Sequence, residues 1–184
     1  MPRTLPGLLC YDKNEKVSEK ALDIVEQQLG YPLIVKTSYG SLGQGVYKVD
    51  NRNQLKQIAE KLIGMPHLFQ KFIKSSYGKD IRVIVIDGKC VAAMVRQSDN
   101  DFRSNLELGG KGTAINPLDE VVKLCEKTAE ILKLDYCGID VLFGEDKYYI
   151  CEVNSNAFFG GIESVTKINI AKKYAEYVIN KIYG

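Results

Sequence analysis

A glycine-rich run between two short apolar segments is the feature that most restricts the fold of this 184-residue chain. The run, Ser38 to Gly45, follows the strand-like segment Pro32 to Lys36 and precedes a second one, Val46 to Val49. A phosphate-binding loop of the Walker type, or the first turn of a dinucleotide-binding fold, would lead into a helix instead. The sequence therefore predicts a glycine loop that joins two strands, which argues against both of those folds.

The remaining pattern predicts a mixture of helices and antiparallel strands. Residues 1–16 are expected to be irregular, and residues 98–115 to form a polar, glycine-rich loop with some strand. Two strands and a helix, followed by antiparallel strands with helices, make an α+β order, with a division near residue 70 into subdomains 1–70 and 71–184. Helices are expected at 18–29, at 52–63 with Asn51 as cap, from Asn116-Pro117 to Leu132, and at 167–182, where one face carries Ile170, Ala171, Tyr174, Ala175, Val178 and Ile182. Further strands are expected at 67–72, 81–86, 90–95, 137–143 and 148–154, with a tight turn at Asp87-Gly88.

Composition excludes several classes of protein. The net charge of +2 is too small to predict a nucleic-acid partner. The apolar run Val83 to Ile86 stops at Asp87, far short of a membrane span, and the N-terminus shows no signal peptide. Five cysteines without a Cys-x-x-Cys pair, and His67 as the single histidine, argue against a zinc site. Reduced thiols fit a cytoplasmic protein best.

Two acidic residues and an asparagine form a candidate metal site. Glu152 and Asn154 lie two apart on an expected strand and share a face. A three-residue loop at 145–147 would place Asp140 opposite Glu152, with the apolar Leu142 and Ile150 farther along the same face. Two carboxylates and an amide oxygen suit Mg²⁺, which takes further ligands from phosphates. The alternative is a solvated hairpin face, and a slip of one residue would remove the pairing.

The glycine run is a candidate phosphate clamp. Gly40, Gly43 and Gly45 allow backbone amides to approach an anion, and Lys36 ends the preceding strand. The alternative is an ordinary flexible hairpin loop with a surface lysine. Ser41 is interpreted as a turn residue rather than a nucleophile, because no base is placed for it.

Other segments carry weaker signals. The segment from Leu68 to Ile73 offers backbone groups and an apolar wall to an adenine ring, although a buried strand is the simpler interpretation. Asp80 and Arg82 share a strand face, where an ion pair is the simpler interpretation. Arg96 and Arg103, with Asn105, are candidates to bind a phosphate or a carboxylate, which an arginine contacts through two nitrogens. The alternative is that these arginines are merely solvated.

The order of these segments is more specific than any one of them. Together they resemble the ATP-grasp superfamily, over roughly residues 30 to 182. The run Asp101-Phe102-Arg103-Ser104-Asn105 followed by Gly109-Gly110, and the later Gly161-Ile162-Glu163, most resemble the RimK-type branch of glutamate and amino-acid ligases. The other matching segments are Pro32 to Lys36, Gly43 to Val46, Gln70 to Ile73, Asp80 to Arg82, Gly138 to Asp140 and Glu152 to Asn154.

The resemblance implies two α+β subdomains with antiparallel sheets that enclose a nucleotide cleft. It implies that phosphates are contacted by Lys36, Gly40, Gly43, Gln44 and Gly45, and that Gln70, Lys71, Phe72 and Ile73 form the adenine hinge. Asp80 would serve the ribose side, and Arg103, Ser104 and Asn105 would line the nucleotide and acceptor end. Arg82, Arg96 and Arg103 are the implied catalytic residues, and Asp140, Glu152 and Asn154 the implied ligands of Mg²⁺, or of Mn²⁺ in its place.

The family reaction phosphorylates a substrate carboxylate with ATP, and an amine then attacks the acyl phosphate to give an amide. The resemblance thus implies ATP, an amino acid and an acceptor with a free carboxylate as partners. This chain departs from the family at Lys71, where a glutamate is frequent, and at Ser155 to Gly160, which lacks the usual proline. Only 35 residues precede Lys36, whereas family members generally carry another domain there. We therefore expect this chain to be a fragment of a longer ligase, or to work with a partner subunit that supplies the missing part. A second hypothesis is a nucleotide-binding module without turnover. A third is an ATP-dependent phosphotransferase.

Overall fold

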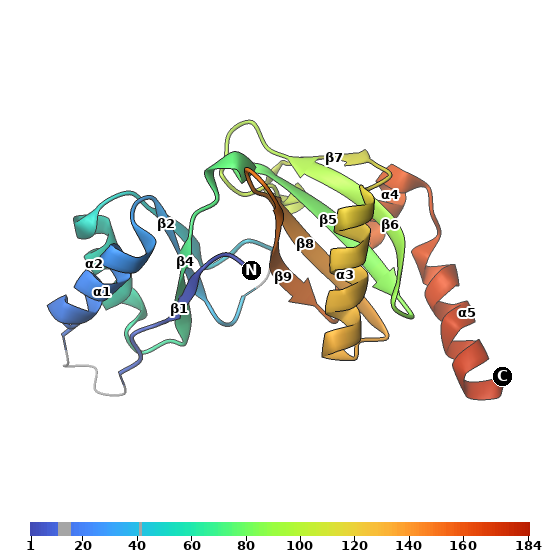
Figure 1. Ribbon diagram of the computed structural model, residues 1–184, viewed down its shortest axis with the longest axis horizontal. Helices are drawn as coiled ribbons and strands as arrows, with labels where there is room; N and C mark the ends of the chain where they lie inside the picture. Colours follow the sequence, from blue (N-terminus) through green and yellow to red (C-terminus); the bar gives the residue numbers. More distant parts are fainter. Residues whose placement is uncertain (11–15, 41) are drawn as a thin grey trace. The chain divides into compact units, whose positions relative to one another are not determined.

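The computed structural model describes residues 1–10, 16–40 and 42–184, and their contacts divide the chain into two compact units, Met1–Lys74 and Ser75–Gly184 (Figure 1). Each unit contains one antiparallel sheet with its own helices. The expected α+β class is therefore confirmed. Ser41, the expected turn residue, lies outside the described residues.

The first unit is a four-stranded sheet with two helices on one face. The strand order is β1-β4-β2-β3, and the strands are β1 (Thr4–Pro6), β2 (Leu33–Thr37), β3 (Val46–Val49) and β4 (His67–Lys71). Helices α1 (Glu19–Leu29) and α2 (Arg52–Leu62) pack together on the sheet, and their buried residues, such as Leu22 and Leu55, share one core with Val35 and Phe69 (Figure 1). Burying each such side chain contributes about 1.5–3 kcal/mol. The glycine loop joins the antiparallel strands β2 and β3, as predicted.

Strand β1 was not expected, because residues 1–16 carry no periodic signal. Thr4, Leu5 and Pro6 pair with residues 68–70 of β4. Three residues are too few to show an alternating pattern, and the pairing exists only once β4 is in place. The prediction that this whole segment is irregular was wrong for these residues.

The second unit is a five-stranded antiparallel sheet in the order β7-β6-β5-β8-β9. A short 3₁₀ turn, η1 (Lys74–Ser76), precedes it, and a second, η2 (Leu106–Leu108), precedes β7. Strands β5 and β6 form the predicted hairpin, and Asp87 and Gly88 at its tip have φ values of 52° and 66°, as a type I′ turn requires. The strands are β5 (Lys79–Ile86), β6 (Lys89–Gln97), β7 (Lys111–Ala114), β8 (Tyr136–Phe143) and β9 (Tyr148–Asn154).

The two faces of this sheet are covered differently (Figure 1). Helix α3 (Asp119–Leu132) packs on one face, where Cys125 lies against residues such as Val83 and Ile139. Part of the other face is covered by α4 (Gly160–Thr166) and α5 (Ile170–Tyr183), where Ile162 joins Ile84. The charged side chains described below lie on this second face, beyond its apolar part.

The C-terminal helices differ from the prediction. A left-handed residue, Lys167 (φ 61°), ends α4, so the expected single helix at 167–182 begins at Ile170 and follows a separate one. The carboxylate of Glu163 accepts hydrogen bonds from the N–H groups of Ile170 and Ala171 at 2.6 and 3.0 Å, which fixes this start. Of the expected apolar face only Ile170 is buried, whereas Ala171, Ala175 and Ile182 are exposed.

Helix α3 also begins later than expected. Its N-cap is Leu118, which makes no capping bond through its side chain, so Asn116 does not cap the helix and Pro117 is not its first residue. The buried stripe is limited to Val121, Cys125 and Ala129.

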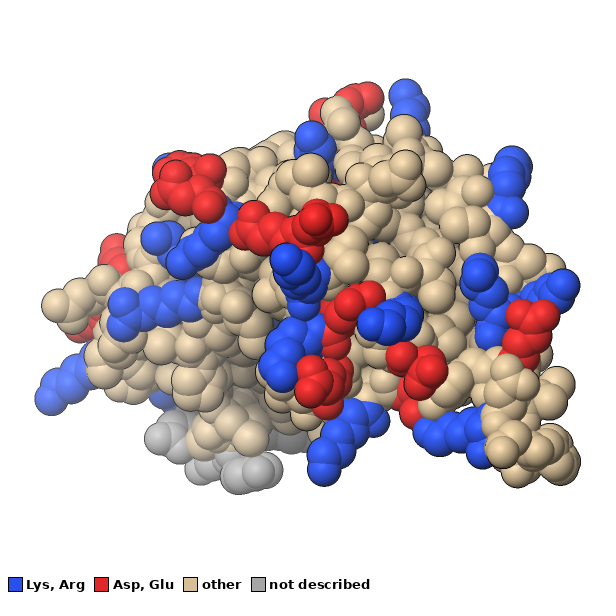
Figure 2. All heavy atoms as spheres, turned by 45° about the vertical axis from the view of Figure 1, so that its right-hand side comes forward, with Lys and Arg blue, Asp and Glu red and all other residues tan. Residues whose placement is uncertain are grey.

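Charged side chains of both signs are interspersed over the described part of the face shown in Figure 2, without a large field of one sign. Within residues 1–10, 16–40 and 42–184, no helix has both the length and the apolar character that crossing a bilayer demands.

Candidate functional site

A row of charged residues crosses four adjacent strands of the second unit, β6, β5, β8 and β9. The register places Asp80 of β5 opposite Arg96 of β6, and Arg82 of β5 opposite Asp140 of β8. Asp140 in turn faces Glu152 of β9. Because directly opposed residues, and residues two apart, point to the same side of a sheet, all five side chains lie on the face opposite α3. The pairing of the strands therefore brings together, on one face, residues that are far apart in the sequence.

Ion pairs link four of these residues in a chain. Arg82 donates to both carboxylate oxygens of Asp140, through Nε and, at 2.9 Å, through Nη2. Arg96 donates to both oxygens of Asp80 at 2.8 and 2.5 Å, and its Nη2 also lies 2.9 Å from Oδ2 of Asp140. Arg96, Asp80 and Asp140 are only 4%, 7% and 9% exposed. Two-nitrogen arginine–carboxylate pairs of this kind fix orientation as well as charge.

Burial and neighbouring charges shift the two aspartates in opposite directions. Burial raises the pKa of Asp80, the charge of Asp140 raises it further, and the bond from Arg96 only partly offsets this. Burial also acts to raise the pKa of Asp140, but Arg82 and Arg96 outweigh it, so that the pKa of Asp140 lies below its usual value. Asp140 is therefore the carboxylate that stays ionised and is suited to hold a cation.

The predicted pairing of Asp140 with Glu152 is confirmed, although the assumed turn was wrong. Phe143 pairs with Tyr148, so the tip spans four residues rather than three. A β-bulge then shifts the register by one residue between Val141 and Asp140, which leaves Cys151 as the extra residue and restores the pairing. The bulge also places Ile150 in the core beneath α3, so the expectation that Ile150 shares a face with Asp140 was wrong.

The three expected metal ligands fit a hard cation. A carboxylate has about four acceptor positions, and Asp140 uses three of them for Arg82 and Arg96, which leaves one. Glu152 is exposed, and Asn154, whose Oδ1 accepts from the N–H of Asn156 at 2.8 Å, follows on the same face. The described residues contain no cluster of three His, Cys, Asp or Glu side chains that would hold a metal. A set of two acids and an amide instead suits an ion that takes further ligands from phosphate.

Of the three residues predicted in the loop before β7, Ser104 contacts Asp80, whereas the bonds of Arg103 and Asn105 lie within the loop. Ser104 is buried and hydrogen-bonds to Asp80. Arg103 binds the carboxylate of Asp101 at 3.1 Å through Nε and at 2.7 Å through Nη2. The carbonyl of Asn105 accepts hydrogen bonds from the N–H groups of Leu108, the last residue of η2, and of Gly110, both at 3.1 Å. Because Asp80 is buried between Arg96 and Ser104, a contact with ribose stays a prediction from the sequence only.

In the first unit, the glycine loop needs its glycines for two separate reasons. Gly43 and Gly45 have φ values of 76° and 73°, in the left-handed region that favours glycine. A Cβ on Gly45 would also lie 2.2 Å from Oγ1 of Thr37. Gly40 has an ordinary φ, but a Cβ there would lie 3.0 Å from the carbonyl oxygen of Gln44. Lys36 is half-buried in β2, and Gln44 is exposed.

Two of the four residues expected to form an adenine hinge, Gln70 and Lys71, lie within strand β4. Strand β4 lies between β1 and β2, so its backbone is paired on both sides. The N–H of Lys71 donates to the carbonyl of Arg3 at 2.9 Å, and the side chain of Gln70 donates to Thr4 at 2.9 Å. Of the four predicted residues, only Phe72 and Ile73 lie beyond the end of the strand, where both are half-buried.

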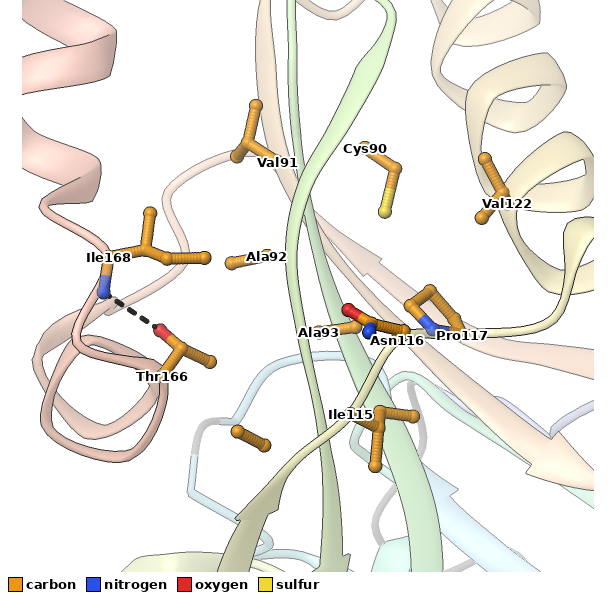
Figure 3. Close-up of a pocket in the computed structure, with 11 residues that line it drawn as sticks. Cys90, Val91, Ala92, Ala93, Ile115, Asn116, Pro117, Val122, Thr166 and Ile168 are labelled. Carbon is orange, nitrogen blue, oxygen red and sulfur yellow. Dashed lines mark hydrogen bonds between the residues drawn. The ribbon is translucent and has the colours of Figure 1, made fainter.

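A separate hollow of about 420 Å³ lies in the second unit, at the other end of β6 (Figure 3). Its walls come from Cys90 to Ala93 of β6, from Ala114 to Pro117 before α3, from Val122 of α3, and from Thr166 and Ile168 between α4 and α5. The dashed line in Figure 3 marks the bond from the N–H of Ile168 to Oγ1 of Thr166. None of the residues predicted for a nucleotide or a metal lines this hollow.

Comparison with known proteins decides the family. The family model of the RimK-like ATP-grasp domain matches residues 12–178. The chain belongs to the RimK-like ATP-grasp family. Among its curated relatives, human N-acetylaspartylglutamate synthase A is 34% identical over 179 residues, which cover 96% of this chain and 45% of the relative. A probable alpha-L-glutamate ligase of Maridesulfovibrio salexigens is 37% identical over 172 residues, which cover 92% and 56%.

Solved ATP-grasp ligases share the fold. The ATP-grasp ligase PsnB, complexed with minimal precursor, Mg and ADP, superimposes with a TM-score of 0.73 at 26% identity and covers 98% of this chain and 53% of that one. The chain thus spans about half the length of the curated relatives that it matches.

Sequence reasoning on this RimK-like domain missed the connections between the predicted residues. Arg96 was predicted to be a ligand-binding or catalytic arginine, or a solvated one, and its bonds to Asp80 and Asp140 were not foreseen. Gly138 was quoted only as part of a motif, yet it lies opposite Asn154 with no room for a side chain. A signal was available for Arg103, since Asp101 precedes it by two residues in a loop.

Proposed function

We propose that this RimK-like chain binds Mg-ATP as the core of an ATP-dependent carboxylate–amine ligase that adds glutamate or another amino acid to an acceptor carboxylate through an acyl phosphate. Family membership and the curated relatives, which include probable alpha-L-glutamate ligases, support this reaction class. The observation that carries the proposal is the pairing of Asp140 with Glu152 across β8 and β9, beside an arginine that binds Asp140.

The chain's own residues have distinct roles in this proposal. Asp140, Glu152 and Asn154 hold Mg²⁺, which when bound neutralises charge on the phosphate oxygens. Arg82, oriented by its pair with Asp140, donates to a phosphoryl oxygen. In the first unit, Lys36 and the backbone amides of the glycine loop contact phosphate oxygens. The catalytic effect comes from position and electrostatics, which is consistent with the lack of a predicted nucleophile.

Isothermal titration with Mg-ATP tests the proposal. We expect Asp140→Ala and Glu152→Ala each to weaken binding by more than about tenfold, because each removes about 1.4 kcal/mol or more of ligand interaction. Glu145→Ala is the matched control, since Glu145 is an exposed acid at the tip of the same hairpin. Unchanged affinity in both Asp140→Ala and Glu152→Ala would overturn the metal assignment.

A second candidate is a nucleotide-binding module without turnover. It is favoured by one observation, that the chain covers only 45% to 56% of the first curated relatives. Release of ADP in the presence of candidate amino acids and carboxylate acceptors separates the two. Binding of Mg-ATP without ADP release would favour the module, and ADP release together with a new amide product would favour the ligase.

A further inference from the structure

We propose that Gly138 is a positioning residue. Because it has no side chain, it leaves room for the guanidinium of Arg82 at the position from which Arg82 donates to a phosphoryl oxygen. This inference rests on the proposed function and adds a residue to it. Gly138 lies in β8, two residues before Asp140, and pairs with Asn154. It is therefore next to two of the expected metal ligands but has no side chain that could bind a metal.

Space, and not backbone conformation, requires glycine at this position. Gly138 lies within a strand and has no left-handed φ, so other residues could adopt its backbone. A Cβ would nevertheless lie 2.5 Å from Cβ of Ala157 and 3.1 Å from Nη1 of Arg82. Both distances are shorter than ordinary van der Waals contacts between such atoms.

To accept a Cβ on Gly138, the guanidinium of Arg82 would have to shift by a few tenths of an ångström against the ion pair that holds it. Its Nε and Nη2 both donate to Asp140, which is held from the other side by Arg96. This leaves Nη1 as the one nitrogen of Arg82 without a hydrogen-bond partner among the residues that the structure describes. Nη1 is the nitrogen of Arg82 that lies nearest to the position of a Cβ on Gly138. A side chain at residue 138 would therefore crowd the remaining donor of Arg82.

Ala157 on the other side is equally constrained. It is 4% exposed, and its carbonyl accepts a 2.6 Å hydrogen bond from the hydroxyl of Tyr136. Its neighbour Asn156 donates its N–H to Oδ1 of Asn154. A methyl group on Gly138 would therefore displace Arg82, or the segment that follows Asn154, or both.

A compensated variant isolates the effect on Arg82. In Gly138→Ala/Ala157→Gly the added methyl replaces the one removed from Ala157, and the contact with Arg82 remains. We expect this variant to bind Mg-ATP about tenfold more weakly, the loss typical of one charge-assisted hydrogen bond. In an Arg82→Ala background the same two changes should cause no further loss, because the donor that they displace is already absent.

Two controls accompany this cycle. Ala157→Gly alone should bind like the wild type. Gly112→Ala adds a methyl to a glycine of β7, where its Cβ would meet only side-chain atoms, at 3.0 Å from Val165 and 3.2 Å from Met94, and it should also leave affinity unchanged. Circular dichroism verifies that each variant is folded.

The outcomes separate this inference from the proposed function. A wild type that does not bind Mg-ATP overturns the proposed function, and the role of Gly138 with it. A wild type that binds, together with a folded Gly138→Ala/Ala157→Gly variant of equal affinity, overturns only the role of Gly138. A loss that adds in full to that of Arg82→Ala also overturns it, because Gly138 would then act by a route other than Arg82.

Discussion

Asp140 and Glu152 face each other across β8 and β9, but they differ sharply in burial. Asp140 is 9% exposed and balances two arginines, whereas Glu152 is exposed. Asp140→Ala leaves Arg82 and Arg96 without that carboxylate, so we expect it to lower the free energy of unfolding by about 3 kcal/mol. Glu152→Ala should change it by less than about 0.5 kcal/mol.

Urea denaturation followed by circular dichroism measures this difference. Both variants should lose Mg-ATP binding, so stability separates a ligand that also supports the fold from one that does not. Equal losses of stability in the two variants would contradict the view that the ion pairs hold Asp140 in place.

At the same scale, the sequence predicted the pairing of Asp140 with Glu152 better than it predicted the surroundings of these two residues. The spacing of Asp140, Glu152 and Asn154 on a hairpin is local information, and the hairpin exists. The bonds of Arg96 depend on β5 lying between β6 and β8, which is a property of the sheet order and leaves no trace in local spacing. The sequence therefore left a solvated Arg96 as an alternative, whereas Arg96 is buried in the structure.

At the scale of elements, the cap of α2 offers a direct test. The side chain of Asn51 accepts a hydrogen bond from the N–H of Gln54 at 3.1 Å, and the side chain of Gln54 accepts from the N–H of Asp50 at 2.8 Å. Asn51→Ala should lower the free energy of unfolding by about 1 kcal/mol, because it leaves a helix N–H without its partner.

Asn53→Ala is the matched control, since Asn53 is exposed within the same helix. Alanine is the better helix former there, so no loss of stability is expected. Urea midpoints of the two variants decide the question, and a loss in Asn53→Ala equal to that in Asn51→Ala would mean that the capping bond contributes nothing.

The elements that the sequence predicted correctly are those with complete local signals. Helix α1 has apolar periodicity and a C-terminal glycine, Gly30 (φ 66°), and α2 has its cap. Helix α4 was missed because its seven residues are too short to show a period, and because the left-handed Lys167 that ends it is not glycine. Strand β1 was missed because a neighbouring strand, and not its own residues, determines it.

At the scale of the whole molecule, buried ionisable groups predict sensitivity to base. Burial raises the pKa of Cys90 to about 11, of Cys125 to about 12, of Cys137 to about 11 and of Tyr136 to about 12, and Glu126 adds to the shift at Cys90. A raised pKa means that the folded chain keeps the proton longer than the unfolded chain. The stabilising effect is therefore complete below the ordinary thiol pKa near 9 and is lost as the pH rises toward 12.

Urea denaturation at about pH 8 and about pH 10.5 measures this loss. The midpoint should fall at the higher pH, and it should fall less in a Cys125→Ala variant, which has one such thiol fewer. A midpoint that is equal at the two pH values would show that these thiols are not protected by burial. All four groups belong to the second unit.

The family could be inferred from the order of short segments along the chain, because that order survives even where single motifs are weak. The paired acids and the hairpins follow from it. The identity of the acceptor and of the amino acid does not, since residues Ser155 to Gly160 depart from the family pattern.

The extra residue at Cys151 has a practical consequence for labelling this protein. It lies between the hairpin tip and the facing acids, while the register of β8 is set independently by its pairing with β5. The register of Asp140 is thus set by two neighbouring strands and not by the exposed tip at Glu145 and Asp146 alone. A fluorophore attached at this tip is expected to leave the pairing of Asp140 with Glu152 unchanged.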